Sequence, residues 1–257
     1  MDPTLPRGTD NAVERMLRAL AELLFPPRDG GGGGAHGALP PLLVGLTFVS
    51  GLVDAVGFVG FDRVFVANMT GNVALLGFAL AGDRQLSAAA SLMALAAFAA
   101  GAATAGRMRR DRPAARLFGP LVAVQAVLVA GALAVSSAGA GPLPSVGLLA
   151  LAMGVQNAVV HRLALPDLTT TVVTRTLTGL AADRWGPAAR RRLVSLGALF
   201  CGALSGGLLT LRHGPWAALA LTIALLAGIA LAGGAAGVPT DGPDGGSAGP
   251  VNGRRDG

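Results

Sequence analysis

Residues 193–211 read LVSLGALFCGALSGGLLTL, a run that contains no charged side chain. About 20 apolar residues without charge are what a helix needs to cross a bilayer core of about 30 Å. Residues 86–106 form a second such run. Across the chain 52% of residues are hydrophobic and 13% are charged, against about 25% charged in a typical globular protein. A soluble protein of this length could not bury so many apolar segments, so we expect an integral membrane protein in contact with the lipid bilayer.

Six segments are long and apolar enough to span a membrane as helices. They cover residues 42–61, 87–106, 118–136, 145–163, 193–211 and 215–233. We therefore predict an all-α fold, a polytopic transmembrane helix bundle over residues 41–235. Small residues recur four positions apart on these segments, a spacing that allows helix backbones to approach closely in lipid. Examples are Ala97, Gly101 and Ala105, and Gly202 and Gly206.

The two ends of the chain are expected to lie outside the membrane. Within 1–40, apolar side chains recur at helical spacing over 10–25, which predicts an amphipathic helix. This helix either lies in the cytoplasmic headgroup region or packs against the domain. A flexible glycine linker follows at 30–34. Residues 236–257 are rich in Gly, Pro and Asp and are expected to form a disordered tail.

Two further apolar segments, 64–82 and 168–183, are ambiguous. Arginines gather in two loops, which the positive-inside rule places in the cytoplasm. The first loop carries Arg107, Arg109, Arg110, Arg112 and Arg116, and the second carries Arg184, Arg190, Arg191 and Arg192. Two clear spans separate the loops, so a spanning 168–183 would put the loops on opposite sides of the membrane. We therefore expect this segment to be re-entrant or broken.

A short internal repeat extends this expectation to the other segment. GLVDA at 51–55 resembles GVQNA at 154–158, and MTGN at 69–72 resembles VTRT at 173–176. Chance similarity in so biased a composition is the alternative.

If the repeat is real, the halves 41–137 and 144–235 each contain three spans and one broken segment. Three is an odd number, so the two halves would have opposite orientations in the membrane. Inverted 3+3 repeats with discontinuous helices are a recurrent design of secondary transporters. Both termini would then be cytoplasmic.

Four motifs carry a resemblance to a known family. They are GLVDA at 51–55, ANMTGN at 67–72, MGVQNA at 153–158 and TLTGLA at 176–181. With their surroundings they resemble the YoaK-type family of bacterial membrane proteins, a domain of unknown function, over roughly residues 40–235. The resemblance implies a multi-pass protein of the bacterial cytoplasmic (inner) membrane and no established reaction or substrate. Arg175 departs from the family, in which a glycine often stands at this position.

Asp54 is the first candidate for a functional residue because it lies inside a predicted span. A charge there costs about 2.5–3.5 kcal/mol on insertion scales and must face protein or water. One interpretation is a proton- or cation-binding site. The alternative is that Asp54 pins a neighbouring helix through hydrogen bonds. Arg175 is a candidate partner for Asp54 in an internal ion pair, or it snorkels towards the membrane interface.

Amide and hydroxyl side chains form a second group of candidates for binding a solute or ion. They are Asn68, Thr70 and Asn72 in the first broken segment, Gln156 and Asn157 on the fourth span, and Thr174, Thr176 and Thr178 in the second broken segment. Such groups suit a neutral or weakly charged solute, with unwound backbone nearby. They also serve as hydrogen-bonding contacts between membrane helices, so a purely structural role is the alternative.

The remaining patterns argue against other classes of protein. His36, His161 and His213 are scattered, so we expect no metal site and no cofactor. No H-E-x-x-H, G-x-S-x-G or Walker A pattern occurs, and basic residues at the ends of spans indicate topology rather than nucleic-acid binding. We expect a small-solute transporter or channel-like protein; the alternative is a non-transporting membrane scaffold or accessory subunit. An intramembrane enzyme is disfavoured because no nucleophile–base pair is evident.

Overall fold

The computed structural model describes residues 39–107, 114–163, 173–183 and 186–235, together with Arg15 and Ala19. The described parts of the chain are helical and contain no strand. The helices are α2 (Leu39–Gly60), α3 (Met69–Leu80), α4 (Ala88–Arg107), α5 (Ala114–Ser137), α6 (Pro142–Leu163), α7 (Val173–Ala182), α8 (Pro187–His213) and α9 (Pro215–Ala235). The expected amphipathic helix at 10–25, the glycine linker and the C-terminal tail lie outside the described residues, apart from Arg15 and Ala19.

The six expected spans are confirmed as six helices long and apolar enough to cross a membrane. These are Pro40–Gly60, Ala88–Arg107, Phe118–Ser137, Pro142–Leu163, Pro187–His213 and Pro215–Gly233. The largest difference is at the fifth, which begins at Pro187 rather than at residue 193. Proline is favoured in the first turn of a helix, where its missing N–H is not needed. The helix therefore starts before the arginines that precede its apolar run.

The segment 64–82 is broken, as expected. Residues 61–68 are not helical, and α3 has 12 residues. At about 1.5 Å per residue a helix of this length reaches about 18 Å, too short for a bilayer core of about 30 Å. Asp62 and Arg63 have φ values of 34° and 51°, and this left-handed turn reverses the chain directly after α2.

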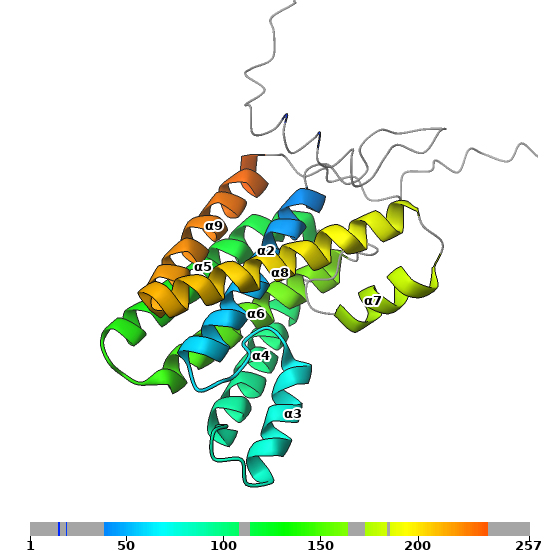
Figure 1. The fold of residues 1–257 in the computed structure, drawn as a ribbon. Coiled ribbons are helices and arrows are strands. Elements are labelled where there is room, and N and C mark those ends of the chain that lie inside the picture. The colour runs from blue at the N-terminus through cyan, green and yellow to red at the C-terminus, as the bar shows by residue number, and fades with distance from the viewer. Residues whose placement is uncertain are drawn as a thin grey trace, which may run out of the picture.

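The segment 168–183 contains α7, which has 10 residues and packs against α8. Residues 164–172 lie outside the described part of the chain. A helix of this length reaches about 15 Å, so α7 by itself cannot span a bilayer. In Figure 1, α7 lies beside α8 on the outside of the bundle, as α3 lies beside α4.

The six long helices pack as two pairs that are joined through α5 and α9. The first pair is α2 with α8, and the second is α4 with α6. Helix α5 packs on α6 and α9, and α9 returns to pack on α2 and α8. The beginning of α2 and the end of α9 lie at the same end of the bundle (Figure 1).

Most of these contacts repeat when the halves of the chain are exchanged; the α8–α9 contact is the exception, because α4 and α5 do not pack to a similar extent within the described residues. If α2, α3, α4 and α5 are matched with α6, α7, α8 and α9, the α2–α8 contact becomes the α6–α4 contact. In the same way α3–α4 becomes α7–α8, and α5–α6 becomes α9–α2. The internal repeat expected from the two short motifs is therefore present in the packing of the described helices.

Glycines at the α2–α8 contact bring the two backbones together. A Cβ atom added to Gly51 would collide with the carbonyl oxygen of Leu199, and one added to Gly202 would collide with that of Phe48. Only a residue without a side chain fits at these two points. The sequence expectation of close approach at Gly202 is confirmed.

The α4–α6 contact uses the same arrangement. A Cβ atom added to Gly154 would collide with the carbonyl oxygen of Phe98, and one added to Gly101 would collide with that of Leu151. In the repeat Gly154 is the counterpart of Gly51. The same glycine-mediated contact therefore occurs twice, once between α2 and α8 and once between α6 and α4.

Candidate functional site

Asp54 holds the segment that follows its own helix. Its Oδ1 atom accepts hydrogen bonds from the backbone N–H groups of Val66 at 2.8 Å, Ala67 at 2.6 Å and Asn68 at 3.4 Å. Consecutive backbone N–H groups form a concave site that favours a negative charge. The side chain remains partly exposed. This geometry agrees with the interpretation that Asp54 pins a neighbouring segment through hydrogen bonds. Ion binding by Asp54 stays a prediction.

These bonds determine how far the broken segment returns along α2. Asp54 lies six residues before Gly60, the last residue of α2, which corresponds to about 9 Å along the helix axis. After the turn at Asp62 and Arg63, the chain comes back along α2 as far as Asp54, and α3 begins there. The described geometry is that of a loop that turns back along α2 and is followed by a short helix of 12 residues.

Two asparagines complete this loop. Asn68 is the N-cap residue of α3, and its side chain accepts a hydrogen bond from the backbone N–H of Gly71 at 3.3 Å. Asn72 is fully buried; its Oδ1 accepts from the N–H of Phe65 at 2.9 Å, and its Nδ2 donates to the same residue's carbonyl at 2.6 Å. Thr70 is exposed. Asp54, Asn68 and Asn72 are therefore brought together, each in contact with backbone.

The candidates of the second half are less closely gathered within the described residues. Asn157 donates to the carbonyl of Met153 at 3.0 Å. Thr178 donates to the carbonyl of Thr174 at 3.0 Å, and both threonines are exposed. Thr176 is buried. In the repeat Asn157 stands where the first half has Asp54, so one half carries a carboxylate and the other an amide.

The Asp54–Arg175 ion pair stays a prediction. Arg175 lies in α7, but its side chain is outside the described part of the structure.

A separate polar cluster lies inside the bundle. Gln156 donates from Nε2 to the hydroxyl of Ser50 at 2.7 Å and to the carbonyl of Leu46 at 3.3 Å. Its Oε1 accepts from Nε2 of Gln125 at 2.7 Å. Ser50, Gln125 and Gln156 are all buried and come from α2, α5 and α6. This cluster connects the two halves of the chain.

Of this cluster, only Gln156 was singled out from the sequence. Two signals could have found the others. Gln125 is an amide inside an otherwise apolar span, and Ser50 lies one helical turn before Asp54 on the same face.

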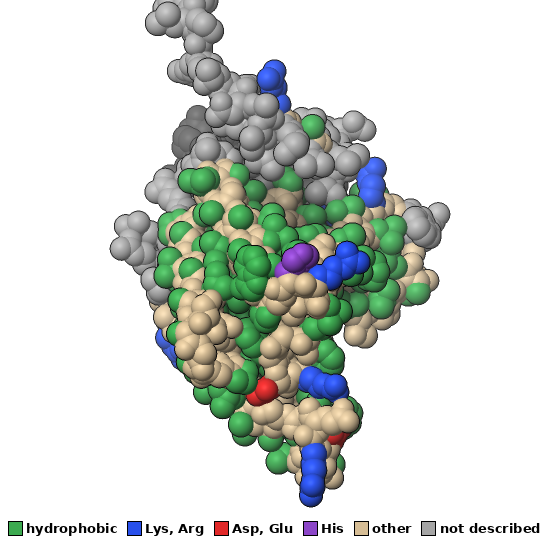
Figure 2. Space-filling view, turned by 60° about the vertical axis from the view of Figure 1, so that its left-hand side comes forward, with side chains coloured by type: hydrophobic (Ala, Val, Ile, Leu, Met, Phe, Trp, Pro, Cys, Tyr) green, Lys and Arg blue, Asp and Glu red, His purple; other side chains and the backbone are tan. Residues whose placement is uncertain are grey.

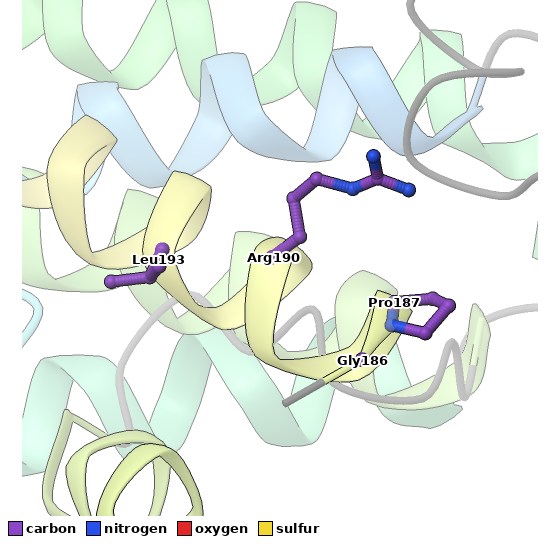
Figure 3. A pocket seen from close by; sticks show the side chains of 4 residues that line it. All are labelled: Gly186, Pro187, Arg190 and Leu193. Atoms are coloured by element: carbon purple, nitrogen blue, oxygen red, sulfur yellow. The ribbon is translucent and has the colours of Figure 1, made fainter. Parts of the chain in front are cut away.

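A shallow hollow lies at the start of α8 (Figure 3). It has a volume of about 400 Å³ and is lined by Gly186, Pro187, Arg190 and Leu193. The Arg190 side chain extends away from the first turn of the helix, and Leu193 points to another side. Among the described residues that line it, Arg190 is the one charged side chain, and no set of convergent ligands is present. Among the described residues no three His, Cys, Asp or Glu side chains are grouped to hold a metal ion.

The outer surface is apolar along the helices. On the face drawn in Figure 2, hydrophobic side chains are spread over the whole of the described surface, and the acidic side chains that it shows lie in its lower half. Large exposed hydrophobic residues include Phe78, Val127, Phe200, Leu211 and Leu231. Exposed apolar surface on this scale fits contact with lipid. The helices and this surface define a polytopic α-helical membrane protein.

Comparison with known proteins identifies the family. The chain belongs to the family described as protein of unknown function (DUF1275), whose model matches residues 42–232. It is also 31% identical over 147 residues to the UPF0700 transmembrane protein YoaK of Bacillus subtilis (strain 168). That match spans 55% of this chain and 65% of the relative. Both findings confirm the resemblance seen in the sequence motifs, and no solved structure matches the chain.

Proposed function

We propose that the chain is a small-solute transporter or channel-like protein built from two inverted halves. The observation that carries this proposal is the glycine-mediated helix pair, which occurs once as α2–α8 and again as α6–α4. Transporters of many folds use inverted repeats, because exchanging the conformations of two similar halves opens a site alternately to each side. A protein that only holds other proteins together does not need two halves that exchange conformations.

The re-entrant segments support the same function. Irregular backbone at membrane depth is tolerated where it is buried in protein or lines an aqueous cavity. Residues 61–68 are such backbone, held at the level of Asp54. The position of α7 beside α8 matches that of α3 beside α4. In the inverted arrangement these two segments enter the membrane from opposite sides and are suited to act as gates.

The proposal includes an orientation in the bacterial cytoplasmic membrane. Arg107 ends α4, and Arg190 lies in the first turn of α8. Basic residues near the ends of spans favour the cytoplasmic side. The end of the bundle that carries these arginines, the start of α2 and the end of α9 is then cytoplasmic, which places both termini inside.

Flux in proteoliposomes tests the function. Purified protein is reconstituted, and uptake of glycerol, urea and protons is compared with that of empty liposomes. We expect at least one flux above the control, and we expect it to fall in Asp54→Ala but not in Asp83→Ala, which alters an exposed carboxylate. No flux of any probe, together with an Asp54→Ala variant that behaves as wild type in cells, would overturn the proposal.

A scaffold or accessory subunit is the second candidate. It is favoured by the finding that Asp54 and Asn72 bind the backbone of the loop at 61–68 and that Asn68 caps α3, as purely structural side chains would. This function predicts that a partner protein co-purifies from native membranes. It also predicts that Asp54→Asn changes thermal stability and nothing else.

A further inference from the structure

The orientation of each side-chain amide in the buried cluster is fixed by its neighbours. The carbonyl of Leu46 can only accept, so the end of Gln156 that lies 3.3 Å from it must be the nitrogen. The oxygen of Gln156 then faces Gln125 and accepts from its Nε2 at 2.7 Å. Gln125 must therefore turn its own oxygen away from Gln156.

That oxygen is an isolated acceptor inside the bundle. Gln125 is 1% exposed, and its Oε1 atom has no hydrogen-bonding partner within the described part of the chain. Buried polar atoms are nearly always hydrogen-bonded, and an exception calls for an explanation. The other polar groups of the cluster are already engaged, because Ser50 donates to Leu46 and accepts from Gln156.

We propose that Gln125, held by Gln156 and Ser50, is the core of a binding site for a small uncharged molecule that donates an O–H or N–H hydrogen bond. The ligand is a donor because the free atom is an acceptor. It is uncharged because the cluster contains no titratable side chain. A metal cation, which needs several oxygen ligands, finds one unengaged oxygen here.

The position of the site connects it with the re-entrant loop. Ser50 and Asp54 lie four residues apart on α2 and therefore on the same face of the helix. The cluster joins α2 and α5 of the first half to α6 of the second, so a relative movement of the halves would reshape it. The inference that this site takes part in transport rests on the proposed function. The inference that a small molecule occupies the site does not.

A high-resolution structure of the full chain in lipid nanodiscs tests occupancy. We expect ordered non-protein density within hydrogen-bonding distance of Gln125 Oε1, about 2.7–3.2 Å. Soaking with urea should change this density, since urea carries N–H donors. A Gln125 Oε1 that is bonded to a protein group, or that has no density at a resolution where other buried waters are visible, would overturn the site.

Flux measurements test whether the solute uses the site. The variant Gln125→Met keeps a similar volume and removes the amide, and Gln85→Met is the matched control at an exposed glutamine. Loss of one hydrogen bond predicts about a fivefold fall in urea or glycerol permeability for Gln125→Met, with Gln85→Met unchanged. Thermal unfolding of each variant shows whether a fall in flux is only a folding defect. The Ser50→Ala variant removes the hydroxyl that positions Gln156 and leaves Gln125 itself in place.

The two measurements separate the two proposals. Density at Gln125 without any wild-type flux would retain the binding site and remove the transport function. Flux that Gln125→Met leaves unchanged would retain transport and remove this site from the solute path. Density together with a selective fall in flux would support both.

Discussion

The Oδ1 atom of Asp54 accepts a hydrogen bond of 2.6 Å from the backbone N–H of Ala67, thirteen residues further along the chain. This contact, with those to Val66 and Asn68, returns the chain to α2 at the point where α3 begins. A carboxylate that accepts several backbone N–H groups stabilises a loop that has no helical hydrogen bonds of its own. Within the described residues, Asp54 is therefore one of the two side chains, with Asn72, that hold the backbone of this loop.

Replacing this side chain should loosen the loop. Asp54→Ala leaves three N–H groups without their acceptor, and bonds to a charged group contribute about 1.5–3 kcal/mol. We expect a loss of about 2 kcal/mol in the free energy of unfolding in detergent, and a smaller loss for Asp54→Asn, which keeps one oxygen. Asp83→Ala, at an exposed position of the turn after α3, should change little. Equal stability of Asp54→Ala and wild type would contradict the pinning role.

Equivalent glycines should respond alike to substitution. Gly51→Ala and Gly154→Ala each place a methyl group against a backbone carbonyl of the partner helix. Overpacking of this kind costs about 1–3 kcal/mol, so both variants should unfold at lower temperature by similar amounts. Gly197→Ala is the control, because a Cβ atom there meets nothing within 4 Å. A large effect at one of the paired glycines and none at the other would argue against a repeated interface.

Asn72 should protect the backbone of the loop from exchange with solvent. Its side chain bonds both the N–H and the carbonyl of Phe65. We expect Asn72→Leu, which keeps the bulk and loses both bonds, to speed hydrogen–deuterium exchange over residues 61–68. Thr70→Val, at an exposed position of α3, should leave the exchange unchanged. Exchange that is unaffected in Asn72→Leu would show that the loop is held by other contacts.

The sequence was sufficient for the features that depend on one helix at a time. Uninterrupted apolar length predicts the spans, and glycine spacing predicts close approach at Gly101 and Gly202. The direction of a polar side chain could not be predicted, since it depends on which helix lies opposite. The bond between Gln156 and Ser50 joins residues 106 positions apart. No local pattern in the sequence shows which polar residues of a span make such a contact with another helix.

Membrane topology follows from the same repeat and can be measured in whole cells. Single cysteines at Arg63, Arg84, Arg107 and Arg190 occupy exposed positions, and Cys201 is replaced by alanine because it is itself exposed. We expect a membrane-impermeant maleimide to label positions 63 and 84 in intact cells.

We expect positions 107 and 190 to be labelled only after permeabilisation. The reason is that α3 and α7 are too short to cross, so each re-entrant segment returns to the side from which it entered. Labelling at 190 in intact cells would mean that the chain crosses the membrane between α6 and α8. The halves would then no longer be inverted, and the transport proposal would lose its main support.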